Sequence, residues 1–393
     1  MNFKDNPEEA AFRAEVREFI NKEIAENVRD ADPEQGMYRR AGQERLRDVR
    51  QKLARRGWIA AAWPKEYGGA GLGVMQQFIM NEEFAENRVP PVGGMGVSMV
   101  GPTLITHGTE AQKKEHLSAI LSGTTHWCQG FSEPGSGSDL ASLQTRAVKD
   151  GDDYIINGQK IWTSGAHLAN WMFMMARTDP EAPKHKGISY FLVDMKSPGI
   201  EVRPLINLAN QEMFNEVFFQ DVRVPAKNIV GELNRGWYVG TTTLDFERSS
   251  IGSAVGLNHA LNELVKYARE NAASGVSRSG YLASIKAELA DRFVEALVAR
   301  LMSYRVVTMQ AKGLIPNHEA SMTKLFASEL NQRIARTGIK VLGLYGQLYG
   351  SDAPMKGRYE STYMTSLAST IAGGTSEIQR NIIATRGLGL PRD

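Results

Sequence analysis

The residues best suited to chemistry lie in three short segments that are far apart in the chain. Residues 132–139 read SEPGSGSD. Their small side chains would let the backbone approach a ligand closely, and the hydroxyls of Ser132 and Ser138 could bind it. Residues 373–380 read GGTSEIQR, a glycine-rich turn before a helix whose exposed N–H groups favour phosphate or other polar atoms. Glu247, within LDFER at 244–248, is a carboxylate that could accept a proton.

Each segment has a plainer interpretation when it is taken alone. The first could be a surface loop, the second a capped helix start, and Glu247 with Arg248 a solvated charge pair. Neither common phosphate-binding fingerprint is present, because the glycines at 135 and 137 lack the third glycine of G-x-G-x-x-G and no P-loop occurs. A nicotinamide-binding Rossmann domain is therefore not expected.

The single cysteine, Cys128, excludes an internal disulfide and a cysteine-based metal cluster. We expect it to be a small buried side chain, and we expect no metal site. It is compatible with a reducing compartment.

Changes in hydrophobic period divide the chain into three regions that must position these segments. Residues 1–125 follow a helical period, and Thr109 opens a capping-box pattern with Gln112. Residues 126–235 contain short apolar or β-branched runs typical of strands. Asn157-Gly158 predicts a hairpin turn there, so an antiparallel barrel or sandwich is expected.

Residues 236–393 return to the helical period and predict a helical bundle. One stripe at helical spacing is expected to lie in its core: Leu282, Ile285, Leu289, Phe293, Leu297 and Leu301.

The composition is that of an ordinary globular protein. Hydrophobic residues make up 42% and charged residues 23% of 393 residues, and the formal net charge is +2. This balance gives no reason to expect nucleic acid or an anionic membrane as a partner. The N-terminal sequence does not resemble a signal peptide, and no run approaches the ~20 apolar residues that span a bilayer. A cytoplasmic location is the default expectation.

Taken together, the three motifs resemble the acyl-CoA dehydrogenases over nearly the whole chain. The resemblance implies an α+β multidomain fold: a helical N-terminal domain (1–125), a middle antiparallel β-barrel or sandwich (126–235) and a C-terminal four-helix bundle (236–393). It also implies FAD as cofactor and an acyl-CoA as substrate.

The resemblance assigns roles to residues of both flavin segments. The segment that begins at Gln129 would lie against the isoalloxazine ring, with Ser132 bonding its N5/O4 edge and Ser138 reaching the CoA portion of the substrate. Trp162 would flank the ring and Ser164 would bond it. In the C-terminal motif, Thr375 and Glu377 would lie near FAD.

The base is the main departure from the commonest family pattern. Many members carry a glutamate immediately before Gly-Thr-Ser, where this chain has Gly373. A minority, including isovaleryl-CoA dehydrogenases, place it on another helix in an LDLER context and have glycine at that position. The resemblance therefore implies Glu247 as the base that takes the α-proton. Asp245 and Arg248 would contact CoA, and the Gly373 N–H would bond the thioester oxygen.

Two segments that hold a neighbouring subunit's FAD in homotetrameric members are altered. The usual Arg-x-x-Phe-Gly reads NAASG at 271–275, and the usual Gln-x-x-Gly-Gly-x-Gly reads KVLGLYG at 340–346. Two explanations stay open. Either a related subunit supplies the adenine-side contacts in an α2β2 tetramer, as in dehydrogenases of steroid side-chain degradation, or this chain binds FAD more weakly.

The expected reaction is dehydrogenation of an acyl-CoA to a trans-2-enoyl-CoA, with hydride transfer to flavin N5 and electron-transfer flavoprotein as the final acceptor. A branched or sterol-derived acyl group is the favoured substrate. Two alternatives remain. One is a flavin monooxygenase of the same fold, and the other is a subunit that completes the FAD site of another chain.

Overall fold

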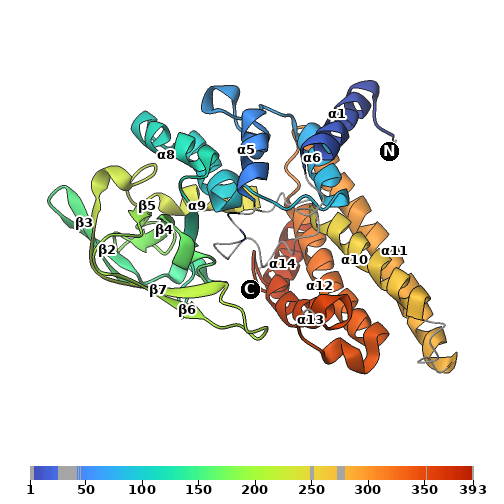
Figure 1. Ribbon diagram of the computed structural model, residues 1–393. Coiled ribbons are helices and arrows are strands. Elements are labelled where there is room, and N and C mark those ends of the chain that lie inside the picture. The colour runs from blue at the N-terminus through green and yellow to red at the C-terminus, as the bar shows by residue number, and fades with distance from the viewer. Residues whose placement is uncertain are drawn as a thin grey trace. The chain divides into compact units, whose positions relative to one another are not determined.

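The elements follow the predicted order of helices, strands and helices (Figure 1). The computed structural model describes residues 4–24, 42, 44, 46–247, 252–271, 279–350 and 352–391, without the side chains of 245–247, 252–253 and 279–282. Contacts divide the chain into two units. The sheet unit comprises residues 19–72 and 89–247, and the bundle unit comprises 1–18, 73–88 and 248–393. The three-domain division expected from sequence stays a prediction.

The sheet unit contains helices as well as strands. They are α5 (Arg47–Arg55), α7 (Gly101–His107), α8 (Glu110–Ser122) and α9 (Gly236–Glu247). The predicted capping box at the start of α8 is confirmed, because the Thr109 hydroxyl accepts from the Gln112 N–H while the Gln112 side chain accepts from the Thr109 N–H. Gly123, in the left-handed conformation, ends the helix.

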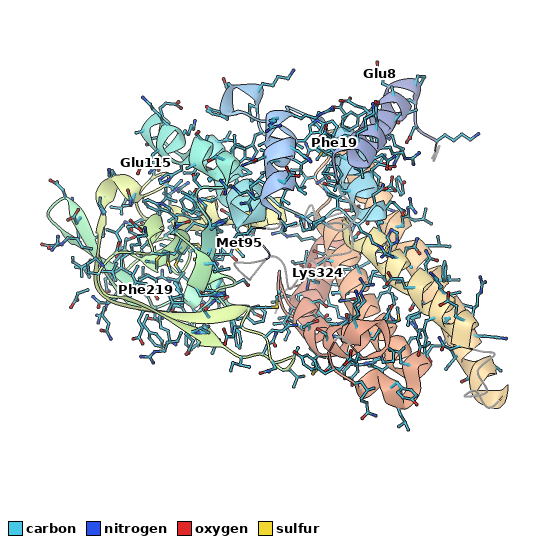
Figure 2. All side chains as sticks on the ribbon, viewed as in Figure 1. Glu8, Phe19, Met95, Glu115, Phe219 and Lys324 are labelled. Carbon is cyan, nitrogen blue, oxygen red and sulfur yellow. The ribbon has the colours of Figure 1, made fainter. Side chains whose placement is uncertain are left out.

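Seven strands form one mixed sheet in the sheet unit. Six follow the order β1-β4-β2-β3-β7-β6, and β5 also pairs with β4. Their bounds are β1 (Trp127–Gly130), β2 (Arg146–Asp150), β3 (Asp153–Lys160), β4 (Trp171–Arg177), β5 (Ile188–Asp194), β6 (Ile200–Leu205) and β7 (Phe214–Pro225). Most pairs are antiparallel, as expected, but β4 pairs in parallel with β1 and with β2. Cys128 is fully buried in the core of this sheet, and Phe219 of β7, labelled in Figure 2, belongs to the same core.

The predicted hairpin turn at Asn157-Gly158 is wrong. β3 continues through both residues, and the two-residue turn that joins β2 to β3 is Gly151-Asp152, with Gly151 at a φ of 62°. Asn157 instead holds a β-bulge opposite it in β7, since its side chain exchanges two 2.9 Å hydrogen bonds with Asp221. Gly158 is required by close packing, because a Cβ there would lie 2.5 Å from the Thr145 hydroxyl.

The bundle unit is built from long helices that pack side by side (Figure 1). They are α10 (Gly252–Asn271), α11 (Ser279–Ala311), α12 (Asn317–Leu342) and α13 (Arg358–Ser369), followed by the short α14 (Ser376–Ile382). Tyr359 ties α13 to α10, because its buried hydroxyl donates to the Ala260 carbonyl at 2.6 Å.

The predicted core stripe on α11 is only half correct. Ile285 and Leu289 are buried and Phe293 is partly buried against the same core, but Leu297 is 51% and Leu301 is 48% exposed within this chain. Leu282 lies outside the described side chains. A helical period identifies an apolar face but does not tell whether the same chain covers it, so this part of α11 presents an apolar surface.

A buried ion-pair network joins α1 (Pro7–Glu23) and α6 (Val74–Glu86) to α11 within the bundle unit. Glu82 and Glu83 are each 2% exposed; Arg13 bonds both, and Arg300 and Tyr304 donate to Glu82 at 2.7 and 2.8 Å. Burial raises the pKa of Glu82, but these hydrogen bonds outweigh it, so the pKa lies below its ordinary value. The carboxylate is therefore held ionised.

The described residues contain neither a candidate membrane span nor a candidate metal cluster. None of their helices combines the length and the apolar character needed to cross a bilayer. They also contain no group of three or more histidine, cysteine or acidic side chains arranged to hold a metal ion.

Candidate functional site

Glu247 is the last residue of helix α9. The first residue of this helix, Gly236, packs against the sheet. Gly236 lets the helix approach β5, since a Cβ there would lie 2.4 Å from the Ser189 carbonyl carbon. Midway along, the buried Thr243 hydroxyl lies 2.8 Å from that of Thr103 and 3.3 Å from that of Tyr190. The helix axis is thus fixed, while the side chains of Asp245 and Glu247, and all of Arg248, lie outside the described residues.

The two segments predicted to hold a flavin adjoin each other in the sheet unit. The Ile161 N–H donates to the Ser132 carbonyl at 3.0 Å. Beyond Ser132 the chain turns tightly, because Glu133 and Ser136 exchange main-chain hydrogen bonds at 2.8 and 3.0 Å. Ser138 is exposed beyond that turn.

A buried ion pair between Lys160 and Glu133 links these two segments. The Lys160 ammonium, fully buried, donates to Glu133 at 2.8 Å and to the Phe131 carbonyl at 3.1 Å. Glu133 also accepts from the main-chain N–H groups of Gln144 and Thr145 at 2.6 and 2.9 Å. Burial lowers the pKa of Lys160, and Glu133 only partly opposes this. Both partners of the pair thus have several hydrogen bonds, as a buried charge requires.

Trp162 is presented to solvent in a conformation that few residues adopt. Its φ is 59° and its side chain is 60% exposed, with one edge contact to Phe214 at 6.1 Å between ring centroids. The next residue is anchored, because Thr163 and Asn215 exchange hydrogen bonds at 3.0 and 2.9 Å. An aromatic ring held exposed at positive φ suggests a ligand-binding role.

Buried polar atoms without a protein partner lie in both segments. Among the described residues, the Gln129 side-chain amide nitrogen and the Thr163 hydroxyl have none. Such groups are uncommon in native structures and call for a ligand or water partner.

The C-terminal motif forms a second group, in the bundle unit. Gly373 and Gly374 have φ values of 64° and 90°, and Thr375 caps α14 by accepting from the Ile378 N–H at 3.2 Å. The carbonyl of Gly374 accepts from Lys324 at 2.6 Å. Hydrogen bonding from its own main-chain N–H, then from Thr375, lowers the pKa of Glu377.

An open cleft surrounds Thr375 and Glu377. Its lining comes from α12, from α14 and from the turn that precedes α14: Glu329, Gln332, Arg333, Arg336, Thr370, Ile371, Thr375, Ser376, Glu377 and Arg380. Three arginines face two glutamates in this lining, so it suits an anionic ligand. Arg380 forms an ion pair with Glu329 at 2.6 Å and Arg333 forms one with Glu295 at 3.1 Å, so Arg336 is the lining arginine without an ion pair among the described residues.

Comparisons with known proteins match the chain from end to end. Three family models cover it: acyl-CoA dehydrogenase N-terminal domain (residues 6–124), middle domain (128–222) and C-terminal domain (234–388). The acyl-CoA dehydrogenase IpdE1 of Mycobacterium tuberculosis is 38% identical over 97% of this chain and 98% of its own length. The chain belongs to the acyl-CoA dehydrogenase family.

Solved structures agree with this assignment. One described as the Tcur3481-Tcur3483 steroid ACAD has a TM-score of 0.87 at 34% identity, covering 100% of both chains. The ChsE4-ChsE5 complex from Mycobacterium tuberculosis has a TM-score of 0.84 at 34% identity, also covering 100% of both chains. The expected fold class and the expected enzyme class are confirmed.

Members of this family are FAD-binding flavoproteins, and the residues described above fit that cofactor. The unpartnered Gln129 and Thr163 groups and the exposed Trp162 ring lie in the two adjoining segments of the sheet unit. The residues that would hold the ring are Gln129, Ser132, Trp162 and Ser164.

Sequence reasoning did not single out Glu133 and Lys160. A signal was available for the first, because Glu133 is the only large charged side chain before the final aspartate of the small-residue motif. Lys160 gave none, since a lysine at the end of a strand is usually exposed.

Proposed function

We propose that this chain catalyses α,β-dehydrogenation of an acyl-CoA thioester to a trans-2-enoyl-CoA, with Glu247 as the base. The observation that carries the proposal is that one glutamate position is lost and another is present. Gly373 stands where many family members carry a glutamate, and a carboxylate stands instead at the end of α9. The anchoring of α9 supports the assignment, because a base must be held in a fixed position.

Bound FAD supplies the hydride acceptor. The chain's own residues do the rest. Ser132 and Ser164 hydrogen-bond the ring and Trp162 covers it, while Glu247 takes the α-proton. The Gly373 N–H polarises the thioester oxygen, and Asp245, Arg248 and Ser138 contact CoA. Thr375 and Glu377 bind FAD.

The test is anaerobic mixing of the holoenzyme with an acyl-CoA that it oxidises. Glu247→Gln is expected to abolish bleaching of the flavin absorbance while FAD stays bound, and Glu232→Gln, an exposed residue just before the same helix, should bleach normally. Full bleaching by Glu247→Gln would remove Glu247 from the mechanism. Rapid oxygen consumption by the reduced enzyme would instead support the monooxygenase alternative.

We further propose a heterotetramer of α2β2 type, with electron-transfer flavoprotein as the acceptor. The altered segments at 271–275 and 340–346 support a partner that completes the FAD site. Apolar side chains left uncovered in the bundle unit support an extensive subunit interface, since Ile315, Leu344 and Tyr349 are 85%, 84% and 78% exposed. Both structural relatives named above are described as paired proteins.

Expression of this chain alone tests the assembly. We expect less than one FAD per chain, because a lost charge-assisted phosphate contact weakens binding by roughly 1.5–3 kcal/mol. One tightly held FAD per chain would rule out the heteromer and favour simple divergence. A branched or steroid-derived acyl group is the proposed substrate class, supported by the description of one relative as a steroid enzyme.

A further inference from the structure

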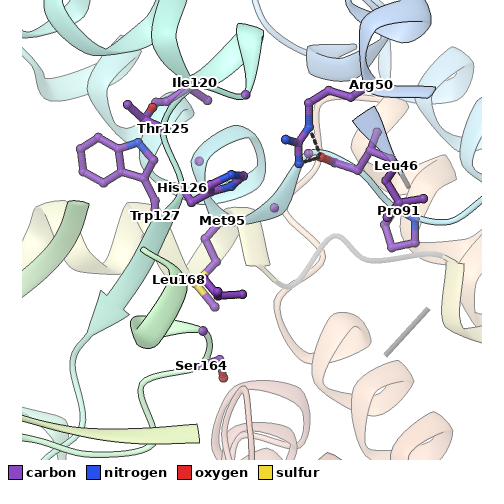
Figure 3. Close-up of a pocket in the computed structure, with 16 residues that line it drawn as sticks. Leu46, Arg50, Pro91, Met95, Ile120, Thr125, His126, Trp127, Ser164 and Leu168 are labelled. Atoms are coloured by element: carbon purple, nitrogen blue, oxygen red, sulfur yellow. Dashed lines mark hydrogen bonds between the residues drawn. The ribbon is translucent and has the colours of Figure 1, made fainter. Parts of the chain in front are cut away.

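A cavity in the sheet unit joins one flavin segment to residues that none of the assignments above includes. It is lined from four places in the chain: Leu46 and Arg50 near α5, residues 91–96, residues 120–127, and Ser164, Gly165 and Leu168. In Figure 3, Ser164 and Arg50 lie at opposite ends of this lining. The cavity therefore extends from the residue proposed to bond the flavin towards a cationic side chain.

Arg50 is held rigidly and keeps unused donors. Its Nε and Nη2 both donate to the Val92 carbonyl, at 3.1 and 2.9 Å, which occupies two of the five N–H groups of the guanidinium. A Cβ on Gly123 would lie 2.5 Å from Nη1, so that side of the guanidinium packs closely against the chain. No carboxylate in the described part of the chain is paired with Arg50, and burial lowers its pKa.

His126 adds a second polar group beside this guanidinium. Its main-chain N–H donates to Asn170 at 2.8 Å, and Figure 3 shows its ring turned towards Arg50. Burial, followed by the positive charge of Arg50, lowers the pKa of His126. The imidazole is thus neutral near pH 7 and has one N–H to donate.

Two further lining residues carry buried polar atoms without a partner among the described residues. These are the hydroxyl of Thr125 and the indole nitrogen of Trp127. The indole cannot turn away, because Trp127 is 6% exposed and stacks on Trp171 with ring centroids 5.6 Å apart. A wholly hydrocarbon acyl chain would leave all these groups unmatched, which is unfavourable in a buried site.

We propose that this cavity binds a hydrogen-bond-accepting oxygen, a carboxylate or a ketone, on the part of the acyl group remote from the thioester. Arg50 is the main donor and His126 assists it. The inference rests on the proposed function, because it treats Ser164 as the flavin end of the cavity. The substrate class is therefore an oxygenated acyl-CoA rather than a plain fatty acyl-CoA.

The test compares acyl-CoAs of equal length, from six to ten carbons, in three forms: unmodified, with a terminal carboxylate, and with a ketone at the penultimate carbon. Calorimetric titration of the dithionite-reduced holoenzyme gives each dissociation constant without turnover. At one or more lengths we expect an oxygenated form to bind at least about tenfold more tightly than the unmodified form.

Arg50→Met should reduce that preference about tenfold or more and leave the affinity for the unmodified chain unchanged. The control is Arg55→Met, an exposed arginine on the same helix, which should leave the preference intact. If Arg50→Met does not fold, Arg50→Lys and His126→Gln provide the same comparison. A stronger effect on the carboxylate series identifies an anion as ligand, and a stronger effect on the ketone series identifies a neutral oxygen.

Two results would overturn the proposal. One is the same affinity for all three forms at every length, and the other is an equal loss of all forms in Arg50→Met. Because binding is measured without chemistry, the preference would persist even if Glu247→Gln showed that the proposed base is wrong.

Discussion

Replacing Lys160 with methionine should destabilise the sheet unit far more than its single ion pair suggests. The change removes a 2.8 Å bond to Glu133 and a 3.1 Å bond to the Phe131 carbonyl, from an ammonium that is fully buried. Glu133, 7% exposed, would keep only two main-chain donors for its charge. Breaking a buried pair on one side typically costs about 3–5 kcal/mol, and because those two donors remain we expect a loss of about 3 kcal/mol.

A double-mutant cycle measures the coupling. The free energy of unfolding in urea is compared for the unmodified protein, Lys160→Met, Glu133→Gln and the double variant. The double variant should be more stable than the sum of the single changes predicts, because neither charge is then left unpaired. The matched control is Arg223→Met, which removes an exposed arginine paired with Asp150 and Asp153 in the same sheet and should change stability little.

The same variants report on the flavin segments. The Ile161–Ser132 hydrogen bond lies next to this ion pair, so Lys160→Met should also shift the visible absorbance spectrum of bound flavin. The reasoning fails if Lys160→Met and Arg223→Met cost the same, or if the single changes add without coupling.

Three further outcomes follow from other features. Glu82, whose folded pKa is depressed, stabilises the protein above its unfolded pKa of about 4.3, and this contribution is lost as pH falls through the folded pKa; Glu82→Gln should therefore flatten the acid limb of a stability–pH curve measured in urea. Gly158→Val would place a Cβ 2.5 Å from the Thr145 hydroxyl and should lower the free energy of unfolding, measured in urea, by about 1–3 kcal/mol, whereas an unchanged free energy of unfolding would contradict the close packing of β3. Trp162→Leu should weaken FAD binding by about 1 kcal/mol in a fluorescence titration, with unchanged far-ultraviolet circular dichroism because the ring is 60% exposed.

The sequence predicted correctly those helices and strands whose formation depends on residues close together in the chain. The capping box at Thr109 and the strands expected within residues 126–235 are confirmed, because both signals arise from neighbouring side chains. Asn157-Gly158 misled because the same residue types serve a tight turn and a β-bulge, and only pairing with β7 decides between them. The exposed end of the α11 stripe could not be foreseen, since burial depends on what else covers the helix.

The candidate site shows the same contrast between local and distant residues. Its motif residues were recognisable from sequence, but the residues that contact and hold those motifs were not. Lys160 lies 27 positions from Glu133, and Arg50 and His126 come from unrelated parts of the chain. Their meeting depends on strand register and helix packing, which no local pattern encodes.

Lys160 and Glu133 hold the turn at residues 131–136 on its buried side, whereas its exposed side makes few contacts. At Gly135 and Gly137 an added methyl group would meet nothing within 4 Å. Evolution, or an engineer, could therefore alter how this loop meets a ligand through these two positions, while Glu133 and Lys160 keep the loop in place. The positions open to change and the residues that keep the loop in place thus lie on opposite sides of the same short turn.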